Sequence, residues 1–324
     1  MSTEMNEKNA WITWERQQRN VSMARVFSAD YYEFSKPRNS YIFRVLVNAF
    51  LTLKVFLKKY QIIFVQNPSI VLVAVSVFIN VFFRKKLVVD AHNAGVFPFE
   101  GKSKLLVAFN NFLLKRSDLV IVSNSSLSRK LSDLGITSIA MPDPIPKLEG
   151  SVRASFDMSP VQVFIVCSWS DDEPIDLYFS LAKAFPNIEF GISGKVKERY
   201  NYLLNDVPEN LKLMGFLPEN EYFYYLASSE TIIDLTTRND CLVCGAYEAI
   251  GAGVPAILSD TTVNRELFIK GIVFSECNDS ALVEALNYLF RDHATLVSEV
   301  GLMKDKMIRD EERNKMRVLE FLTE

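Results

Sequence analysis

Short apolar runs recur at regular intervals along the chain, and each is followed by a segment of helical length. Such an alternation of strand and helix is typical of parallel sheets in α/β domains. In the first half, the predicted strands are 10–13, 61–66, 86–90 and 118–123. The predicted helices of this half are 16–29, 41–60, 69–83, 102–116 and 125–134.

The alternation breaks at residues 141–146, which contain three prolines and lead into a polar stretch that continues to about Ser159. We place the domain boundary here, with one Rossmann-like domain at 1–145 and a second at 146–300. The predicted strands of the second domain are 161–167, 188–192, 211–214, 231–235, 256–259 and 271–274. A charged helix follows, and we expect residues 301–324 to pack back on the N-terminal domain.

The charge is distributed unevenly. The formal net charge is −3, but residues 1–150 hold 20 Lys and Arg against 11 Asp and Glu, and the remainder holds 16 against 28. A strongly basic nucleic-acid-binding protein is therefore excluded, and only the first half is suited to an anionic surface.

Cysteine usage and hydropathy favour a cytoplasmic protein. The four cysteines include a single close pair, which suggests a reducing compartment. The polar N-terminus lacks the pattern of a signal peptide. The uncharged residues 67–83, which precede Arg84, contain a proline and are fewer than the roughly 20 residues of a membrane-spanning helix, so we expect a buried helix.

Glycine placement excludes two common nucleotide-binding motifs. All twelve glycines lie at or after Gly95, and neither GxGxxG nor GxxxxGK[ST] occurs. Both motifs need glycines so that the backbone can approach the phosphates. A dinucleotide-binding or P-loop protein is therefore disfavoured.

The segment 236–260 carries the strongest candidate site. It indicates a strand end, a polar loop, a helix beginning near Val243 and another strand. The helix would present free N–H groups to a phosphate, with Asp240 just before it and Glu248 one turn inside. The lone Cys241-x2-Cys244 pair has no second Cys or His pair, so we expect no zinc or other metal.

The spacing Asp240-x7-Glu248, followed by Ala-Ile-Gly-Ala-Gly-Val-Pro at 249–255 and preceded by Gly-Phe-Leu-Pro-Glu at 215–219, resembles the signature of GT-B glycosyltransferases, especially glycosyltransferase family 4. The resemblance implies two Rossmann-like parallel-sheet domains facing a central cleft. It also implies a nucleotide-diphosphate sugar as co-substrate, no further cofactor and no metal.

Carried over by position, the resemblance assigns donor contacts in the second domain. Asp240 would contact the sugar, and Glu248 would bind the ribose. The backbone amides of the diphosphate site would come from Cys241, Leu242, Val243 and Cys244. The Arg and Lys pair that usually follows the first strand of this domain is replaced by the acidic stretch 167–174. We therefore assign the diphosphate's cations to Lys195 and Arg238, although each also fits a solvated surface cation.

The first domain carries two further candidate segments. Asp-Ala-His-Asn at 90–93 resembles the strand-Asp-x-His segment of GT-B enzymes, which predicts His92 as a catalytic group and Asn93 as an acceptor contact. A structural histidine with a backbone partner is the alternative.

Trp14, Glu15, Arg16 and Arg19 resemble the Trp-Glu-x-x-x-Arg opening of some bacterial members. Glu15 would then be a base, and Trp14, Arg16 and Arg19 would bind the acceptor, with Arg19 contacting an acceptor phosphate. A capping glutamate and an exposed cation are the alternative.

Two basic segments lie beside large apolar residues. The cations are Lys54, Lys58, Lys59, Arg84, Lys85 and Lys86, and the aromatic residues are Phe50, Phe56 and Phe83. Such surfaces suit an anionic membrane, but ordinary amphipathic helices that cover a sheet share the pattern.

The sequence therefore predicts a metal-independent glycosyltransferase that transfers a hexosyl group from a UDP- or GDP-linked sugar to a glycan or lipid-linked acceptor. The expected setting is bacterial polysaccharide assembly at the cytoplasmic face of the inner membrane. The alternatives are a catalytically degenerate GT-B subunit and a nucleotide-sugar 2-epimerase. Retention or inversion of the anomeric configuration stays open.

Overall fold

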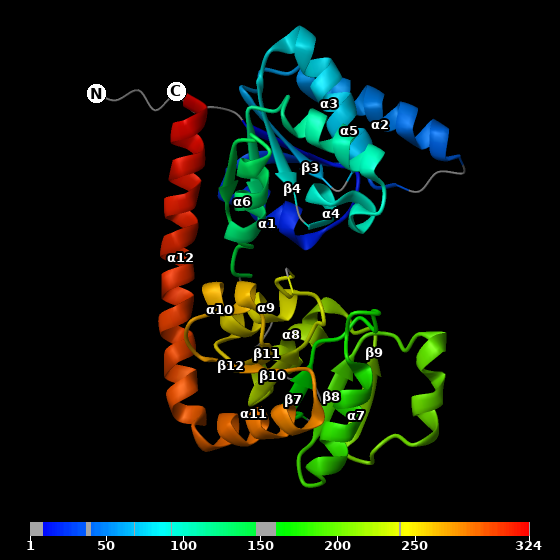
Figure 1. The fold of residues 1–324 in the computed structure, drawn as a ribbon, viewed down its shortest axis with the longest axis vertical. Coiled ribbons are helices and arrows are strands. Elements are labelled where there is room, and N and C mark those ends of the chain that lie inside the picture. Colours follow the sequence, from blue (N-terminus) through cyan, green and yellow to red (C-terminus); the bar gives the residue numbers. More distant parts are fainter. Residues whose placement is uncertain are drawn as a thin grey trace. The chain divides into compact units, whose positions relative to one another are not determined.

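The computed structural model describes residues 9–36, 40–67, 69–91, 93–146, 160–239 and 241–323. It divides into two compact units (Figure 1). Unit 1 comprises residues 1–144 and 309–324, and unit 2 comprises residues 145–308.

Unit 1 is built on a six-stranded parallel sheet in the order β2-β1-β3-β4-β5-β6. Its strands are β1 (Asn9–Thr13), β2 (Ala29–Glu33), β3 (Ile62–Asn67), β4 (Lys86–Ala91), β5 (Leu119–Val122) and β6 (Ser138–Ala140). Its helices are α1 (Gln18–Val26), α2 (Tyr41–Phe56), α3 (Ile70–Phe83), α4 (Asn93–Val96), α5 (Lys104–Leu114) and α6 (Ser125–Asp133), with the 3-10 helix η1 (Pro98–Gly101).

Unit 2 has a second six-stranded parallel sheet, in the order β12-β11-β10-β7-β8-β9. Its strands are β7 (Val163–Ile165), β8 (Phe190–Ser193), β9 (Leu211–Gly215), β10 (Thr231–Asp234), β11 (Ala256–Ser259) and β12 (Ile272–Ser275). Its helices are α7 (Ile175–Ala184), α8 (Glu219–Ser228), α9 (Cys244–Ala252), α10 (Thr262–Leu267) and α11 (Asp279–Arg291), with the 3-10 helix η3 (Glu198–Asn205). The predicted class of two Rossmann-like parallel-sheet domains is confirmed.

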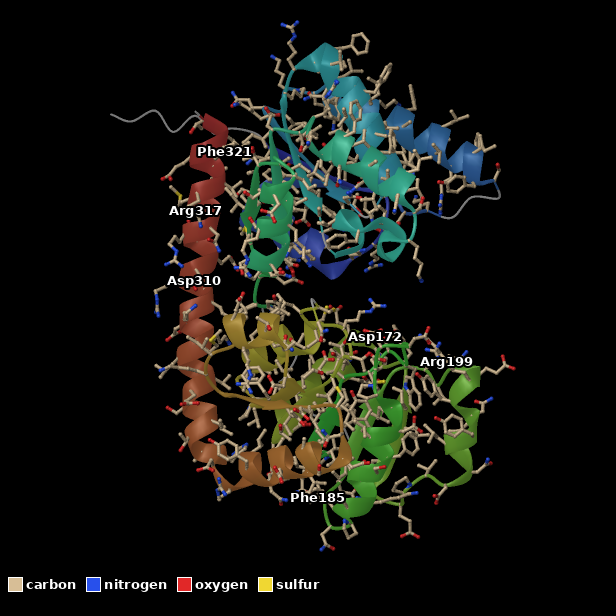
Figure 2. All side chains as sticks on the ribbon, in the orientation of Figure 1. Asp172, Phe185, Arg199, Asp310, Arg317 and Phe321 are labelled. Carbon is tan, nitrogen blue, oxygen red and sulfur yellow. The ribbon has the colours of Figure 1, made fainter. Side chains whose placement is uncertain are left out.

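The last helix, α12 (His293–Thr323), contributes to both units. Val300 and Met303 are buried in the core of unit 2, whereas Val318 and Leu322 are buried against Trp11 in unit 1. Figure 2 labels Arg317 and Phe321 near the end of this helix.

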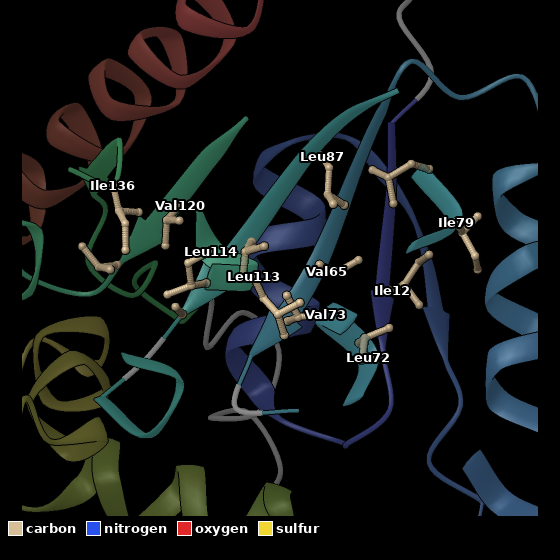
Figure 3. Close-up of a cluster of buried hydrophobic side chains, with 14 of the residues drawn as sticks. Ile12, Val65, Leu72, Val73, Ile79, Leu87, Leu113, Leu114, Val120 and Ile136 are labelled. Atoms are coloured by element: carbon tan, nitrogen blue, oxygen red, sulfur yellow. The ribbon is translucent and has the colours of Figure 1, made fainter. Parts of the chain in front are cut away.

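The strands of unit 1 bury apolar side chains on both faces, as expected for a parallel sheet covered by helices. On one face, Ile12 and Val65 pack with Leu72 of α3 and Leu113 of α5 (Figure 3). On the other face, residues of α1 and α12 pack against alternate strand positions such as Phe64. The sheet is thereby held rigid, and the loops at its carboxyl edge are left to carry functional side chains.

Candidate functional site

The strand order of unit 2 reverses between β7 and β10. From β7 the chain proceeds outward through β8 and β9, and from β10 it proceeds in the opposite direction through β11 and β12. In open α/β sheets the loops diverge at such a reversal, and ligands bind at the carboxyl ends of the two strands. The loops at this point are residues 166–174 and 235–243, and the second includes most of the predicted donor-binding residues.

Helix α9 begins in the second loop. Its N-cap residue, Val243, is extended and makes no side-chain capping hydrogen bond. Asp234, at the end of β10, accepts a hydrogen bond from the backbone N–H of Gly245 at 2.8 Å. Burial raises the pKa of Asp234 well above its usual value. The first turn of α9 is thus fixed against β10, with the backbone of Val243 and Cys244 at the loop.

Glu248 lies one turn inside α9, and its carboxylate is held by a neighbouring helix. The hydroxyl of Tyr222, on α8, donates to Oε2 of Glu248 at 2.5 Å. Burial raises the pKa of Glu248 and of Tyr222. Sequence reasoning missed Tyr222, because nothing in the run of tyrosines at 222–225 distinguishes the one that reaches α9.

The predicted donor cations lie at the same edge of the sheet. Arg238 follows β10 and pairs with Asp172, with 3.5 Å between Nε and Oδ2. Asp172 is labelled in Figure 2, and it also accepts from the hydroxyl of Thr236 at 2.9 Å. Lys195 follows β8, where it is exposed and forms no ion pair with a described residue. Of the two, Arg238 is therefore the cation at the strand reversal.

In the acidic loop after β7, backbone N–H groups bind the side-chain carboxylate of Glu173 from the same loop. Oε1 of Glu173 accepts from the backbone N–H of Ser168 at 3.0 Å, and Oε2 accepts from that of Ser170 at 2.6 Å. Between them Trp169 has a φ of 59°, in the left-handed region. The N–H groups of Ser168 and Ser170 converge on one carboxylate, as in an anion-binding nest, whereas the N–H of Trp169 between them donates to Sγ of Cys167 at 3.3 Å. Glu173 occupies this nest, within the acidic stretch 167–174.

Arg199 is a further cation at this loop that the sequence did not single out. It lies on η3, donates from Nη2 to the carbonyl of Trp169 at 2.8 Å and pairs with Asp171. Figure 2 labels it. Its sequence neighbourhood, Lys-Glu-Arg-Tyr at 197–200, has no signal beyond that of a solvated segment.

In unit 1 the strand order reverses between β1 and β3. The hydroxyl of Thr13 donates to Oε1 of Gln66 at 2.7 Å across this point. Trp14 follows, half-buried, with its indole N–H donating to the hydroxyl of Thr52 at 3.1 Å. Glu15 and Arg16 come next and are exposed. These three predicted acceptor-side residues therefore lie at the carboxyl edge of the sheet.

Arg19 has a different environment from the predicted one. Its side chain is only 3% exposed, and its guanidinium binds Asp90 bidentately, with Nη2 2.7 Å from Oδ1 and Nε 3.0 Å from Oδ2. It also pairs with Asp143 and donates to the carbonyl of Met141 at 3.1 Å. These ion pairs join α1, β4 and the segment after β6 within unit 1, and a contact of Arg19 with an acceptor phosphate stays a prediction.

His92 and Asp240, the two residues predicted to contact the reacting sugar, lie outside the described residues. Asn93 is the first residue of α4. Beside it, Asn67 and Asn110 both donate to the carbonyl of Gly95, at 2.9 and 2.8 Å. These buried amides fix the short α4 at the end of β4.

No family model matches the sequence, and no curated protein matches it. Solved structures do resemble it. Sucrose-phosphate synthase from Thermosynechococcus elongatus aligns with a TM-score of 0.73 at 11% identity, over 97% of this chain and 98% of that one. HepE from Anabaena, in complex with UDP-glucose, aligns with a TM-score of 0.75 at 12% identity, over 96% of this chain and 99% of that one.

A third structure, assigned as a UDP-N-acetylglucosamine 2-epimerase from Listeria monocytogenes, aligns with a TM-score of 0.64 at 11% identity, over 93% and 95% of the two chains. These likenesses, together with the two parallel six-stranded sheets, show that the chain has the GT-B fold.

Proposed function

We propose that this protein is a glycosyltransferase that binds a nucleotide-diphosphate sugar on unit 2 and transfers the sugar to an acceptor bound on unit 1. One observation carries the proposal. The N-terminus of α9 lies at the strand reversal, where its N-cap residue Val243 provides no side-chain cap, and Glu248 is held one turn away by Tyr222. A helix N-terminus binds a phosphate through its free N–H groups and its dipole. A carboxylate one turn further along the helix is suited to the hydroxyls of a ribose.

The residues at this edge would bind different parts of the donor. The backbone from Cys241 to Cys244 donates to the diphosphate, and Arg238 and Lys195 supply positive charge. As the sugar leaves, negative charge develops on the diphosphate, and fixed donors stabilise it without a metal ion. Asp240 contacts the donor sugar.

On unit 1, His92 and Glu15 are the proposed proton carriers, and Trp14, Arg16 and Asn93 are the proposed acceptor contacts. The hydrogen bond from Trp14 to Thr52, which holds the indole at the carboxyl edge of the sheet, supports this assignment. We place the reaction in bacterial polysaccharide or lipid-linked glycan assembly, at the cytoplasmic face of the inner membrane. UDP-linked donors are the first to test, because HepE was solved with UDP-glucose.

Calorimetric titration of the full chain with UDP, GDP, UDP-glucose and GDP-mannose tests the donor site. We expect one nucleotide class to bind, and a ligand at 100 times its dissociation constant should stabilise the fold by about 2.7 kcal/mol. Glu248→Gln should weaken nucleotide binding at least tenfold. The control Glu284→Gln, at an exposed position on α11, should not. Absence of binding by every nucleotide and nucleotide sugar would overturn the proposal.

A catalytically degenerate GT-B subunit is the second candidate, and the Glu173 carboxylate in the nest after β7 favours it. A carboxylate there repels a diphosphate at the same edge. Nucleotide release from bound donors distinguishes the two, because an enzyme liberates UDP or GDP and a degenerate subunit does not. NMR of UDP-N-acetylglucosamine incubated with the protein tests the epimerase alternative at the same time.

A further inference from the structure

One face of unit 1 exposes large apolar side chains on three neighbouring helices. Helix α3 contacts both α2 and α5, and all three pack on the same face of the sheet through their buried sides. We call their outer surface the three-helix face. Its most exposed apolar side chains are between 56% and 79% accessible. They include Ile42, Leu46, Phe50, Phe78, Phe82 and Leu105.

The three-helix face is also hollowed. An apolar groove of about 480 Å³ lies between Phe50 and Leu53 of α2 and Val75, Phe78 and Ile79 of α3. Phe78 and Phe82 stack edge to face at 5.7 Å, one helical turn apart. Phe78 and Phe82 pack against each other while both stay exposed, and the groove beside Phe78 is open.

The charge on this face has one sign. No Asp or Glu occurs in α2, α3 or α5, whereas Arg44, Lys54 and Lys104 are exposed on them. The Lys54 ammonium lies 4.6 Å from the centre of the Phe50 ring, and the Arg116 guanidinium lies 4.7 Å from that of Phe112. Such side chains place an apolar stem and a cationic tip on the same surface, as at membrane interfaces.

The structure changes which residues belong to this surface. Phe56 is buried, and Phe83 packs beside it with 6.2 Å between ring centres. The ammonium of Lys85 donates hydrogen bonds to the carbonyls of Lys58 and Tyr60. Phe56, expected beside a membrane, therefore belongs to the interior of unit 1, whereas Phe83 and Lys85 are half-buried. Residues of α5, absent from the sequence prediction, take their place.

We infer that the three-helix face docks on the surface of an anionic phospholipid bilayer. The exposed aromatic and aliphatic side chains enter the headgroup and acyl boundary, and the cations contact lipid phosphates. A second copy of the chain fits less well, because a two-fold contact would place this cationic face against itself with no carboxylates from the three helices. None of the described helices is long and apolar enough to cross a bilayer.

This inference deepens the membrane location in the proposed function by naming the surface that makes the contact, and it is tested separately, because lipid binding is measured without donor or acceptor. Its consequence for that function is a lipid-linked acceptor reached from the bilayer surface. A chain that binds vesicles but no nucleotide would support the inference and overturn the glycosyltransferase. A chain that binds a nucleotide but no vesicles would overturn the inference and leave the proposed glycosyltransferase supported.

Vesicle co-sedimentation of the full chain tests the docking surface. Phosphatidylcholine vesicles with and without phosphatidylglycerol are compared at low and high salt. We expect at least tenfold tighter binding to the anionic vesicles, weakened by salt because exposed charges are screened. Leu46→Ser with Phe82→Ser, and separately Lys54→Glu with Lys104→Glu, should each reduce the binding at least tenfold.

The matched control is Leu302→Ser, which changes an exposed leucine of α12 that is 53% accessible in unit 2. Its vesicle binding should equal that of the parent chain. Thermal unfolding establishes that each variant is folded, and sedimentation velocity without lipid measures self-association. Equal binding to both vesicle types would overturn the inference. So would loss of binding in the control, or a lipid-free dimer that Phe82→Ser dissociates.

Discussion

The carboxylate of Asp234 and the backbone of Gly245 are in such close contact that no side chain fits between them. A Cβ at Gly245 would lie 2.5 Å from Oδ2 of Asp234. Gly245→Ala should therefore displace the first turn of α9, lower the free energy of unfolding by about 1–3 kcal/mol and weaken nucleotide binding at least tenfold. Urea unfolding and calorimetric titration measure the two effects.

Gly301→Ala is the matched control for that substitution. A Cβ at Gly301, inside α12, would meet no atom within 4 Å. Alanine is the better helix former, so the variant should be about 0.5–1 kcal/mol more stable, with unchanged nucleotide affinity. Equal effects of the two substitutions would contradict a specific role for Gly245.

The raised pKa of Asp234 predicts a stability that falls as pH rises. In the unfolded chain this carboxyl titrates near its ordinary value, whereas burial and the nearby carboxylates of Glu248, Glu173 and Asp172 raise its pKa in the folded chain. Between the two pKa values the unfolded state binds fewer protons. Each pH unit in that window should then lower the free energy of unfolding by about 1.4 kcal/mol.

Asp234→Asn removes this titration and keeps an oxygen that can accept from Gly245. Urea unfolding of the variant from pH 4.5 to 8 should show a flatter dependence than that of the parent chain. The pH dependence that remains in the variant includes the contribution of Glu248, whose pKa is also raised. Identical profiles would mean that Asp234 is ionised in the folded protein throughout this range.

Substitution of one member of the Arg19–Asp90 pair should lower the free energy of unfolding strongly. Asp90 is fully buried, and Arg19→Met would leave its charge without its bidentate partner. Removing one member of a buried ion pair destabilises a protein by about 3–5 kcal/mol. The double change Arg19→Met with Asp90→Asn should recover part of this loss. If the single and double variants unfold at the same urea concentration, the unpaired charge of Asp90 is not the cause of the destabilisation.

Glu173→Gln tests the filled nest at the end of β7. The substitution removes one negative charge from the loop and keeps an oxygen for the N–H groups of Ser168 and Ser170. Nucleoside diphosphate affinity should rise roughly fivefold to tenfold, equivalent to about 1–1.4 kcal/mol. Glu276→Gln removes a carboxylate that follows β12 at the same edge and should change affinity less. Weaker binding by Glu173→Gln would indicate that this carboxylate supports the donor site.

The sequence predicted the central strands well, because parallel strands buried on both faces are continuous apolar runs. Ile62–Asn67 and Lys86–Ala91 are examples. It missed β2, Ala29–Glu33, which lies at the edge of its sheet and has the polar, half-buried sequence ADYYE. It also missed β6, which is three residues long. Edge strands pair on one side only, so their composition carries little of the apolar signal.

The candidate site was predictable where chemistry depends on neighbours in sequence. The start of α9 and the position of Glu248 follow from the local pattern of loop, helix and small residues. Tyr222 and the internal role of Arg19 do not, because each depends on a partner far along the chain. Arg19 and Asp143 are 124 positions apart, and no local pattern reports such a pair.

The shared helix α12 also imposes an order on biosynthesis. Residues 145–308 of unit 2 are contiguous, and all of them are synthesised before the part of α12 that belongs to unit 1. The core of unit 1 lacks Val318 and Leu322 until that part of α12 is made, although its strands are made first. The half of the protein that is translated first is therefore the last to be completed, and its exposed apolar sheet face would need protection during synthesis.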